Sequence, residues 1–418
     1  MEDFASLKIY AVDAVVLVLT HIVPDRERLT RWAKHRIRTL IFFIGPVDGN
    51  LNTAENLEDL AEVRKYKDLP RNGRDSFRQL LARGLDKLEA TPLRTVLVTD
   101  EARFIAMAGR NRMELLIGIN SGHERRKFYQ HGADLVLDSL NDLAVYGVDS
   151  EPGFSQRLPN IFSLQNKFQA IFRERKPVFF FDYDGTLTPI VSEPSEAVIQ
   201  DDMRYLLEGL ARFHSLAVVS GRDMEDLRNF IRLDDIIYAG SHGFRISGPG
   251  GLYMEQEQAK AMISGLDRIE SMLRDKLENR IEGLEIERKR YAIAVHYRNS
   301  PPGSFRRIHA LVTETIAENP DFKKARGKKI LEIKPSTDWH KGRAIEWILQ
   351  ALGLDDTKQY CPIYLGDDIT DEDAFRTLAD DGIGILVGDH GQPTAASFQL
   401  KDVSQVKKFL HYALQSEI

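Results

Sequence analysis

Cysteine is almost absent from this chain of 418 residues, whose single thiol is that of Cys361. An internal disulfide is therefore impossible, which suits a reducing compartment. Long blocks of like charge are also missing, since 57 basic and 63 acidic residues are interspersed and leave a net charge of −6. We expect neither DNA nor RNA as a partner. The oligomeric state stays open, and a monomer is compatible with the sequence.

Long uninterrupted hydrophobic runs are missing as well. The apolar stretch over residues 12–23 is broken by Asp13 and His21, and residues 1–4 carry no basic leader. Both features argue against a membrane span and against a signal peptide, so we expect a cytoplasmic protein without a membrane partner. The content of 43% hydrophobic and 29% charged residues is that of a globular protein longer than one ordinary domain.

What the sequence does contain is a pair of acids after a short apolar run, in the string Phe-Asp-Tyr-Asp-Gly-Thr-Leu-Thr-Pro at residues 181–189. The run predicts a buried strand over 177–181, whose carboxyl end presents Asp182 and Asp184 where open α/β folds bind ligands. Asp182 is suited to attack phosphorus as a nucleophile, and Asp184 to act as acid and base. Gly185 permits the sharp turn that close approach of a phosphate needs. An Asp-Gly hairpin turn is the structural alternative.

The string resembles the first signature of the haloacid dehalogenase superfamily, Asp-x-Asp-Gly-Thr. The other three signatures of this superfamily have counterparts that follow in order. The second corresponds to an apolar strand over 216–219 that ends in Ser220 and Gly221. The resemblance implies that the Ser220 hydroxyl and the Gly221 N–H hold phosphoryl oxygens. An ordinary loop that leads into a helix is the alternative.

The third and fourth signatures supply a cation and further acids. Lys341 opens a helical run and, by the resemblance, neutralises the phosphate, although an exposed lysine in a first turn is the alternative. In the fourth, paired carboxylates follow an apolar strand, and Asp367 is the expected metal ligand. Asp368 and Asp371 are expected to support the metal ligands without binding the metal themselves. For Asp371, Glu372 and Asp373, acids that favour a helix N-terminus after Thr370 are the alternative.

The chemistry itself demands a cation. Phosphate monoesters are among the slowest substrates to hydrolyse in water, and here an anionic nucleophile must approach an anionic phosphate. We therefore expect Mg²⁺ to bridge Asp182, the carbonyl of Asp184 and Asp367, with Lys341 on the other side. Pump ATPases resemble the first signature but lack the second acid, whereas Asp184 allows the aspartyl-phosphate to be hydrolysed.

Within the superfamily, residues 173–418 are most similar to the trehalose-6-phosphate phosphatases. The similarity rests on the extended strings Asp-Tyr-Asp-Gly-Thr-Leu-Thr-Pro and Gly-Asp-Asp-x-Thr-Asp-Glu-Asp-Ala-Phe, and on an insert over 244–335. It implies hydrolysis of trehalose 6-phosphate to trehalose and phosphate, the last step of trehalose biosynthesis. One departure is His340, where the family often has Asp or Asn. The loop Gly240-Ser-His242-Gly243 also resembles a family segment near the site, a turn histidine being the alternative.

The insert forms a cap over the phosphate site in that family. Here, apolar residues at helical spacing predict a long helix over 257–280. Alternation of apolar and polar residues then predicts strands over 284–290 and 291–298, and a further strand over 328–334. Together they indicate an α+β cap of helix, hairpin, helix and strand.

The strands of the cap carry the residues expected to bind the sugar. Members of the family recognise the distal glucose with a lysine and an arginine nine positions apart, and with a lysine and a glutamate four apart. Lys289 with Arg298, and Lys328 with Glu332, reproduce both spacings. By alternation, His296 lies on the same face as Arg298. Solvated strand faces are the alternative for all five residues.

The first 150 residues predict another α/β unit. Strand-like runs over 9–19, 39–44, 95–98, 115–119 and 135–137 alternate with helical stretches such as 76–88. Asp13 aligns with the first acid of the first signature, but Val15 stands where the second acid belongs. The unit resembles a degenerate domain of the same superfamily, as in trehalose-phosphate phosphatases of some actinobacteria that carry an inactive leading domain. We expect no phosphoryl transfer there.

We therefore predict an α/β protein with a haloacid dehalogenase-like Rossmannoid core, an inserted α+β cap and an N-terminal α/β domain. The expected limits are 1–150 for the N-terminal domain, 151–172 for a linker and helix, 173–243 with 336–418 for the catalytic core, and 244–335 for the cap.

Other functions remain open at this point. A phosphomutase shares all four signatures but returns the phosphoryl group to a sugar. A non-catalytic regulatory protein is a second alternative and fits the first domain better than the second. Sucrose-phosphate and mannosyl-phosphoglycerate phosphatases resemble the core, so the cap must distinguish a trehalose 6-phosphate substrate from other small-molecule sugar phosphates.

Overall fold

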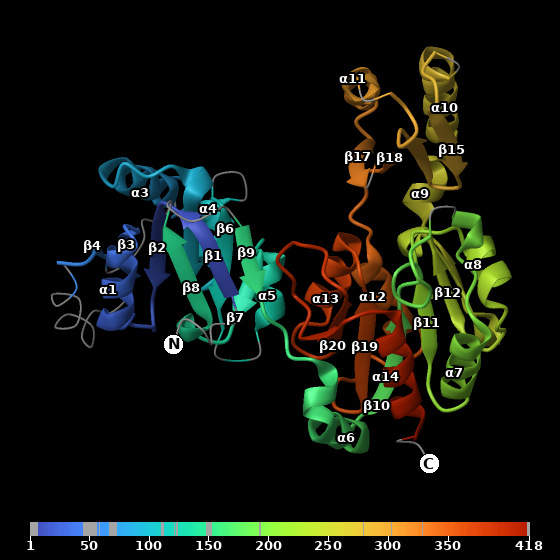
Figure 1. Cartoon of the computed structure of the whole chain (residues 1–418), viewed down its shortest axis with the longest axis horizontal. Coiled ribbons are helices and arrows are strands. Elements are labelled where there is room, and N and C mark those ends of the chain that lie inside the picture. The colour runs from blue at the N-terminus through green and yellow to red at the C-terminus, as the bar shows by residue number, and fades with distance from the viewer. Residues whose placement is uncertain are drawn as a thin grey trace. The chain divides into compact units, whose positions relative to one another are not determined.

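The computed structural model divides into two compact units, Met1–Gln165 with Phe375–Lys401 and Asn166–Ala374 with Asp402–Ile418. Figure 1 traces the chain through them from blue to red. The structure describes residues 7–44, 57, 59–66, 73–109, 113–120, 122, 124–147, 153–191, 194–278, 280–301, 303–327 and 329–415. Lys328 lies outside these residues. The predicted domain limits differ from this division and stay a prediction.

The N-terminal region contains a six-stranded parallel sheet in the order β4-β3-β2-β5-β6-β7. Every residue of its central strand β2 is buried, as expected for a parallel strand covered on both faces. Its elements are β2 (Ala14–Leu19), α1 (Arg26–Lys34), β3 (Arg38–Ile44), β4 (Glu62–Tyr66), α3 (Gly73–Lys87), η3 (Pro92–Arg94), β5 (Thr95–Thr99), α4 (Ala102–Ala108), β6 (Leu115–Ile119), α5 (Arg125–Gln130) and β7 (Leu135–Leu137). The predicted α/β unit is confirmed.

A second, three-stranded sheet has the order β8-β1-β9. It consists of β1 (Leu7–Val12), β8 (Leu143–Gly147) and β9 (Gly153–Gln156), and η4 (Leu140–Asp142) leads into β8. The single strand predicted over 9–19 is wrong, because β1 and β2 lie in different sheets. The run is interrupted at Asp13, between the end of β1 at Val12 and the start of β2 at Ala14. Within β1, Ala11 adopts a left-handed φ of 60°, and the register on β8 shifts between Ile9 and Val12. After β9, η5 (Ile161–Leu164) and α6 (Gln165–Glu174) lead to the next sheet.

An eight-stranded sheet follows, in the order β14-β13-β12-β11-β10-β19-β20-β21. Its first strand, β10, was predicted over 177–181 and runs from Lys176 to Phe181, with five of its six residues buried. The elements are β10, η6 (Pro194–Glu196), α7 (Asp201–Ala211), β11 (Leu216–Val219), α8 (Met224–Ile231), β12 (Ile237–Gly240), η7 (Ser241–Gly243), β13 (Arg245–Ser247), η8 (Pro249–Gly251), β14 (Tyr253–Glu255), α12 (Lys341–Ala351), β19 (Tyr360–Gly366), η9 (Ile369–Asp371), α13 (Glu372–Thr377), β20 (Ile383–Val387), β21 (Phe398–Leu400) and α14 (Val403–Gln415). Strands β12, β11, β10 and β19 are parallel, which places their carboxyl ends at one edge.

The six-stranded sheet repeats the order of six strands of the larger one, β12-β11-β10-β19-β20-β21. In each set of six, the first strand in the chain is central, the next two extend one side, and three later strands extend the other side, while β13 and β14 are additions to the larger sheet. Strand β2 therefore corresponds to β10. Asp13 precedes β2, at the opposite end from the position that Asp182 occupies after β10. Our alignment of Asp13 with the first signature is wrong, and Thr20 is the residue that follows the corresponding strand.

The cap is inserted between β14 and α12 and has its own sheet, in the order β15-β16-β18-β17. Its elements are α9 (Glu257–Ala261), α10 (Ile263–Leu277), β15 (Glu285–Lys289), β16 (Ala292–His296), α11 (Ser304–Glu318), β17 (Phe322–Gly327) and β18 (Ile330–Pro335). The helix predicted over 257–280 is two helices that meet at Met262. Ala259 of α9 packs beside Phe244 and Tyr291, and Ile263 at the start of α10 contacts this same cluster. The rest of the apolar face of α10, from Leu266 on, lies in the core of the cap.

In the part of the chain that the structure describes, no helix has both the length and the apolar character that crossing a membrane requires.

Candidate active site

Four predicted site residues meet at the carboxyl edge of the eight-stranded sheet. Asp182 follows β10, Ser220 follows β11, Asp367 follows β19, and Lys341 is the first residue of α12. Strand pairing aligns the three strand ends, because β10 lies between β11 and β19 and is parallel to both. Asp182, Ser220 and Lys341 are buried. Residues far apart in the sequence thus form one constellation, where open α/β folds place their ligands.

Lys341 is held by two carboxylates. Its Nζ lies 2.7 Å from Oδ1 of Asp182 and 2.6 Å from Oδ1 of Asp371. Burial disfavours the charged amine, but the two carboxylates outweigh it, so the pKa of Lys341 is raised and the cation is retained. The Lys341 side chain is only 3% exposed, and its charge is therefore directed at Asp182 rather than at solvent.

Asp371 positions this lysine. The Tyr364 hydroxyl donates to its Oδ1 at 2.6 Å, and the backbone N–H of Asp368 donates to its Oδ2 at 2.9 Å. Both of its oxygens are therefore already hydrogen-bonded. Sequence reasoning missed Tyr364, although its place in β19, three residues before Asp367 that follows this strand, was the available signal.

The carboxylates outnumber the cations here. Oxygen atoms of Asp182, Asp367 and Asp371 lie within 4.8 Å of one another. Burial, together with the neighbouring carboxylates, raises the pKa of Asp367, and burial raises that of Asp182 in spite of Lys341. A further cation would relieve this crowding of negative charge.

Asp367 also has a carboxylate oxygen that is available to bind a ligand. Its Oδ1 is buried and has no hydrogen-bond partner among the described residues. Gly185, at a φ of 81°, packs so closely that a Cβ there would lie 2.1 Å from Oδ2 of Asp367. An unpaired buried carboxylate oxygen is costly, and a divalent cation with a preference for oxygen ligands would satisfy it. The donor set therefore fits a divalent metal, with Asp371 the least available of the three acids.

Asp184, two residues after Asp182, is paired with an arginine. Arg222 donates through Nε to Oδ2 at 2.6 Å and through Nη2 to Oδ1 at 2.7 Å, a bidentate ion pair. The guanidinium also lies over the rings of Tyr183 and Phe230, at 5.5 and 5.1 Å from their centroids. Sequence reasoning gave Arg222 no role, although it directly follows the Ser-Gly pair of the second signature.

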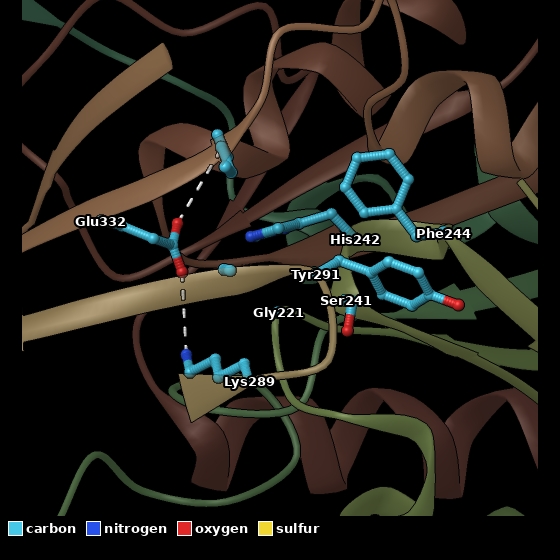
Figure 2. A pocket seen from close by; sticks show the side chains of 9 residues that line it. Gly221, Ser241, His242, Phe244, Lys289, Tyr291 and Glu332 are labelled. Atoms are coloured by element: carbon cyan, nitrogen blue, oxygen red, sulfur yellow. Dashed lines mark ion pairs between the residues drawn. The ribbon is translucent and has the colours of Figure 1, made fainter. Parts of the chain in front are cut away.

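The cap brings some of its predicted residues over this edge. Figure 2 shows a pocket between the core, which contributes Gly221, His242 and Phe244, and the cap, which contributes Lys289, Tyr291 and Glu332. Glu332 is paired with Lys289 at 3.7 Å and with Lys334 at 4.0 Å. These opposite charges leave both hydrogen-bond donors and acceptors facing the pocket.

Other predicted sugar-binding residues have different positions. Arg298 is exposed, two residues beyond the end of β16, and it does not line the described pocket. His296 is half-buried, with Nε2 at 2.8 Å from Oε2 of Glu287 in the neighbouring strand. Lys328 lies outside the described residues.

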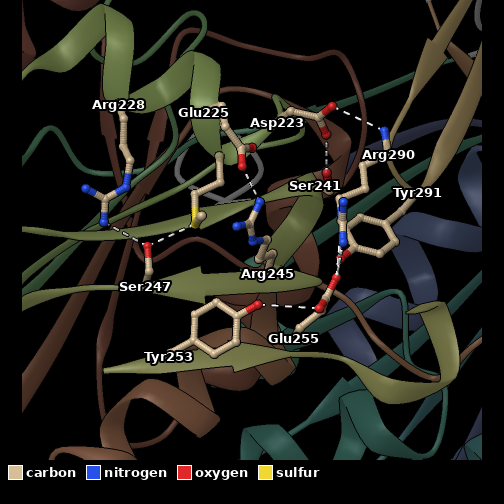
Figure 3. Close-up of polar contacts among 11 residues, drawn as sticks. Asp223, Glu225, Arg228, Ser241, Arg245, Ser247, Tyr253, Glu255, Arg290 and Tyr291 are labelled. Atoms are coloured by element: carbon tan, nitrogen blue, oxygen red, sulfur yellow. Dashed lines mark hydrogen bonds and ion pairs between the residues drawn. The ribbon is translucent and has the colours of Figure 1, made fainter. Parts of the chain in front are cut away.

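A polar network joins the turn of the cap hairpin to the core, as Figure 3 shows. Arg290 donates to Glu255 through Nη2 at 2.7 Å, and the Tyr291 hydroxyl donates to the same carboxylate. The backbone N–H of Arg290 donates to Asp223 at 3.2 Å, and the Ser241 hydroxyl donates to Asp223 at 2.6 Å. The hydrogen bond from Tyr291, with those from Arg290, lowers the pKa of Glu255 to about 2. The cap is thereby tied to β14 and to the start of α8.

Comparison with known proteins agrees with this geometry. A family model described as trehalose-phosphatase matches residues 180–404. A trehalose-phosphate phosphatase of Mycobacterium marinum is 34% identical over 340 residues, which cover 81% of this chain and 86% of that protein. A match of that length includes part of the N-terminal region as well as the core and cap. The trehalose 6-phosphate phosphatase RA3 of Zea mays is 36% identical over 277 residues, 63% of this chain and 76% of that protein.

One solved structure extends the comparison to the fold. It is a trehalose-6-phosphate phosphatase related protein with a TM-score of 0.50 and 26% identity, and the match covers 57% of this chain and 97% of the other. The predicted fold class, a haloacid dehalogenase-like core with a cap and an extra N-terminal α/β domain, is confirmed.

Proposed function

This chain belongs to the trehalose-phosphatase family, and we propose that it hydrolyses trehalose 6-phosphate at the site of Asp182, Lys341 and Asp367. The observation that carries the proposal is the contact of the Lys341 amine, at 2.7 Å, with one oxygen of Asp182 at the edge where a phosphate can approach. A buried carboxylate fixed by a cation on one oxygen presents its other oxygen in a defined direction.

In the first step, the free oxygen of Asp182 attacks phosphorus while the bond from phosphorus to the sugar oxygen breaks. The leaving oxygen takes a proton from Asp184, and the phosphoryl group remains on Asp182 as an aspartyl-phosphate. In the second step, water attacks the phosphorus, Asp184 takes up its proton, and inorganic phosphate and the Asp182 carboxylate are released. Ser220 and the Gly221 N–H bind the phosphoryl oxygens throughout, and Lys341 offsets their charge.

Arg222 controls when Asp184 can act. Its guanidinium occupies both oxygens of the carboxylate, so neither can deliver or accept a proton while the pair is intact. Proton transfer to the leaving oxygen therefore requires the pair to open as substrate enters and the released carboxylate to take up a proton from solvent. Because Tyr183 and Phe230 hold the guanidinium, we expect Asp184, rather than Arg222, to rotate.

We propose Mg²⁺ as the metal, held by the carboxylates of Asp182 and Asp367 and the carbonyl of Asp184. When bound, it supplies positive charge that permits an anionic nucleophile to meet an anionic phosphate. Asp368 and Asp371 support the site through their hydrogen bond to each other, and Asp371 also fixes Lys341. The free Oδ1 of Asp367 is the atom that most favours this assignment.

Sugar recognition is assigned to the cap. Lys289 and Glu332 face the pocket and offer a donor and an acceptor to hydroxyl groups. Arg298 and Lys328 remain candidates on the strength of their spacing, and His296 because alternation places it on the same face as Arg298. Relatives named for trehalose phosphate support a disaccharide as substrate, because it reaches from the phosphate site to the cap.

The test is an assay of phosphate release with a panel of sugar phosphates in the presence of Mg²⁺. We expect a clear preference for trehalose 6-phosphate over glucose 6-phosphate, and trehalose as the second product. Equal turnover of the two substrates would contradict the proposal. Formation of an isomerised sugar phosphate without free phosphate would identify a phosphomutase instead.

A further inference from the structure

His242 lines the pocket, and the proposed mechanism gives it no role. His242 belongs to a turn in which Ser241, His242 and Gly243 have consecutive φ values of 50°, 57° and 89°. Residues other than glycine adopt this left-handed region only at a cost, and the surrounding structure must enforce it. Because backbone strain of this kind clusters at functional sites, the conformation of this turn points to a function for His242.

The enforcing contacts come from the phosphate-binding loop. The backbone N–H of Ser241 donates to the carbonyl of Arg222, and that of His242 donates to the carbonyl of Ser220, each at 2.7 Å. The Ser241 hydroxyl is anchored on Asp223, as Figure 3 shows. The turn is therefore fixed to the residues that follow β11, and the direction of the His242 side chain is fixed with it.

The imidazole of His242 lies directly against Gly221. A Cβ on Gly221 would lie 2.9 Å from Cε1 and 3.0 Å from Nε2 of the ring. The ring also lines the pocket, where Figure 2 places it between Glu332 on one side and the rings of Phe244 and Tyr291 on the other. Among the described residues, neither ring nitrogen has a hydrogen-bond partner. A polar group is thus held in the pocket without a hydrogen-bond partner in the described part of the chain.

The surroundings keep this imidazole uncharged. Burial and the nearby amines of Lys334, Lys341 and Lys289 hold the pKa of His242 well below its ordinary value. A neutral imidazole has one nitrogen that donates and one that accepts, whereas the lysines of the pocket can only donate. Such a group suits a hydroxyl of an uncharged sugar, which also donates and accepts, and adds no attraction for a second anion.

We propose that His242 is a specificity-determining residue that hydrogen-bonds the sugar ring bearing the phosphate. The inference rests on the proposed function, since it takes the phosphate to lie at Ser220 and Gly221. His242 contacts Gly221 on one side, and the Lys289–Glu332 pair lies across the pocket from it. The ring attached to the phosphate is the first part of the substrate to pass His242, and the second ring reaches Lys289 and Glu332.

The experiment compares His242→Gly and His242→Asn with the wild type in the full chain. Glycine removes the ring and adopts the left-handed conformation without strain, and asparagine tolerates this conformation and retains a donor and an acceptor. Trehalose 6-phosphate and p-nitrophenyl phosphate are used as substrates. Glucose 6-phosphate is used as a competitive inhibitor of p-nitrophenyl phosphate hydrolysis.

For His242→Gly we expect kcat/KM for trehalose 6-phosphate to fall roughly 5- to 100-fold, the effect of leaving a buried hydroxyl without its partner. The inhibition constant of glucose 6-phosphate should rise by a similar factor, while p-nitrophenyl phosphate hydrolysis stays within about 2-fold of wild type. His242→Asn should recover part of the loss. Glu332→Gln is the matched control for the far ring. It should lower kcat/KM for trehalose 6-phosphate and leave the inhibition constant of glucose 6-phosphate unchanged.

Three outcomes overturn the inference. Equal losses on all three compounds place His242 at the phosphate, a loss on trehalose 6-phosphate alone places it at the second ring, and no change removes it from recognition. Wild-type protein that fails to hydrolyse trehalose 6-phosphate refutes the proposed function itself. If the wild type turns over this substrate and His242→Gly equals it, only the role of His242 is refuted.

Discussion

The six-stranded sheet and the eight-stranded sheet share the order of six strands but differ at their carboxyl edges. After β10, the larger sheet has Asp182 and Asp184, and after β19 it has Asp367. After β2, the smaller sheet has Thr20, and after β5 it has Asp100. Only the position of Asp367 therefore keeps an acid in both sheets.

The two matching acids have opposite surroundings. Both oxygens of Asp100 accept hydrogen bonds from Thr20. The backbone N–H groups of His21 and Ile22 donate further hydrogen bonds to Oδ2 of Asp100, at 2.7 and 3.0 Å. Asp367 has a buried oxygen with no partner among the described residues. The loop after β2 thus donates backbone hydrogen bonds to Asp100, the acid that follows β5. The loop after β10 instead adds Asp182 and Asp184, and Oδ1 of Asp367 has no partner among the described residues.

This difference shows that the fold alone does not make a metal site at the carboxyl edge of a sheet. One carboxylate alone is stabilised by neighbouring N–H groups and has no need of a metal. Several buried carboxylates repel one another and create a demand for a cation. The N-terminal region also lacks a counterpart of the cap: in its described residues, α3 and η3 are the elements between β4 and β5. We propose that it performs no phosphoryl transfer.

The largest effect should come from the residues that follow the first strand of each sheet. Asp182→Asn should lower phosphate release by more than about 10⁴-fold, because it removes the nucleophile, and should leave no covalent intermediate. Thr20→Ala, at the corresponding position after β2, should leave the rate unchanged. Phosphate release and mass measurement of the trapped protein check both. Substantial activity in Asp182→Asn would disprove the assignment.

The next effect concerns the acids that follow β19 and β5, which are Asp367 and Asp100. Asp367→Asn should reduce activity at least about 100-fold and abolish stabilisation by Mg²⁺, whereas Asp100→Asn should do neither. At 100 times its dissociation constant the metal should raise the Tm of the wild type by roughly 5 to 10 °C. Thermal unfolding with and without Mg²⁺ checks this independently of turnover. A retained shift in Asp367→Asn would move the metal elsewhere.

A smaller effect should appear where the cap is attached, a feature that only the larger sheet has. Glu255→Gln should cost about 1 to 2 kcal/mol near pH 7, because it weakens the hydrogen bonds with Arg290 and Tyr291. The pKa of Glu255 is lowered in the folded state to about 2. Its contribution is therefore complete above the unfolded value and is lost as the pH falls toward 2.

The difference in unfolding free energy between wild type and Glu255→Gln should accordingly shrink between pH about 4.5 and about 2. Chemical denaturation across this range measures it. Glu257→Gln is the matched control, because Glu257 is an exposed glutamate two residues away, and it should show no such trend. A difference that stays constant with pH would mean that the ionised carboxylate is not what ties the cap to the core.

The smallest effect is expected at Asp13. It lies before β2, where its Oδ2 accepts a hydrogen bond from Thr91 at 3.1 Å. Asp13→Ala should leave phosphatase activity unchanged and cost at most about 1 kcal/mol of stability. Steady-state kinetics and thermal unfolding of the full chain decide this. Loss of activity with an intact fold would give the N-terminal region a role in catalysis.

Several features were predictable because they depend on residues close in sequence. The strand before Asp182, the acid after β19 and the hairpin of the cap follow from apolar runs and alternation. The break between β1 and β2 was not, because a run of apolar residues does not reveal that its two halves pair with strands of different sheets. The separation of α9 from α10 was likewise hidden, since apolar residues at helical spacing do not reveal the interruption at Met262.

The sequence by itself determined which chemical groups are available: two acids after one strand, a serine and glycine after the next, a lysine at a helix start and an acid after a later strand. The tertiary structure alone decided how these groups are used. The pair of Arg222 with Asp184, the support of Lys341 by Asp371 and the unpaired oxygen of Asp367 are contacts between distant segments. Their existence depends on strand pairing and burial, which set distance and local dielectric, and neither is encoded in the spacing of a motif.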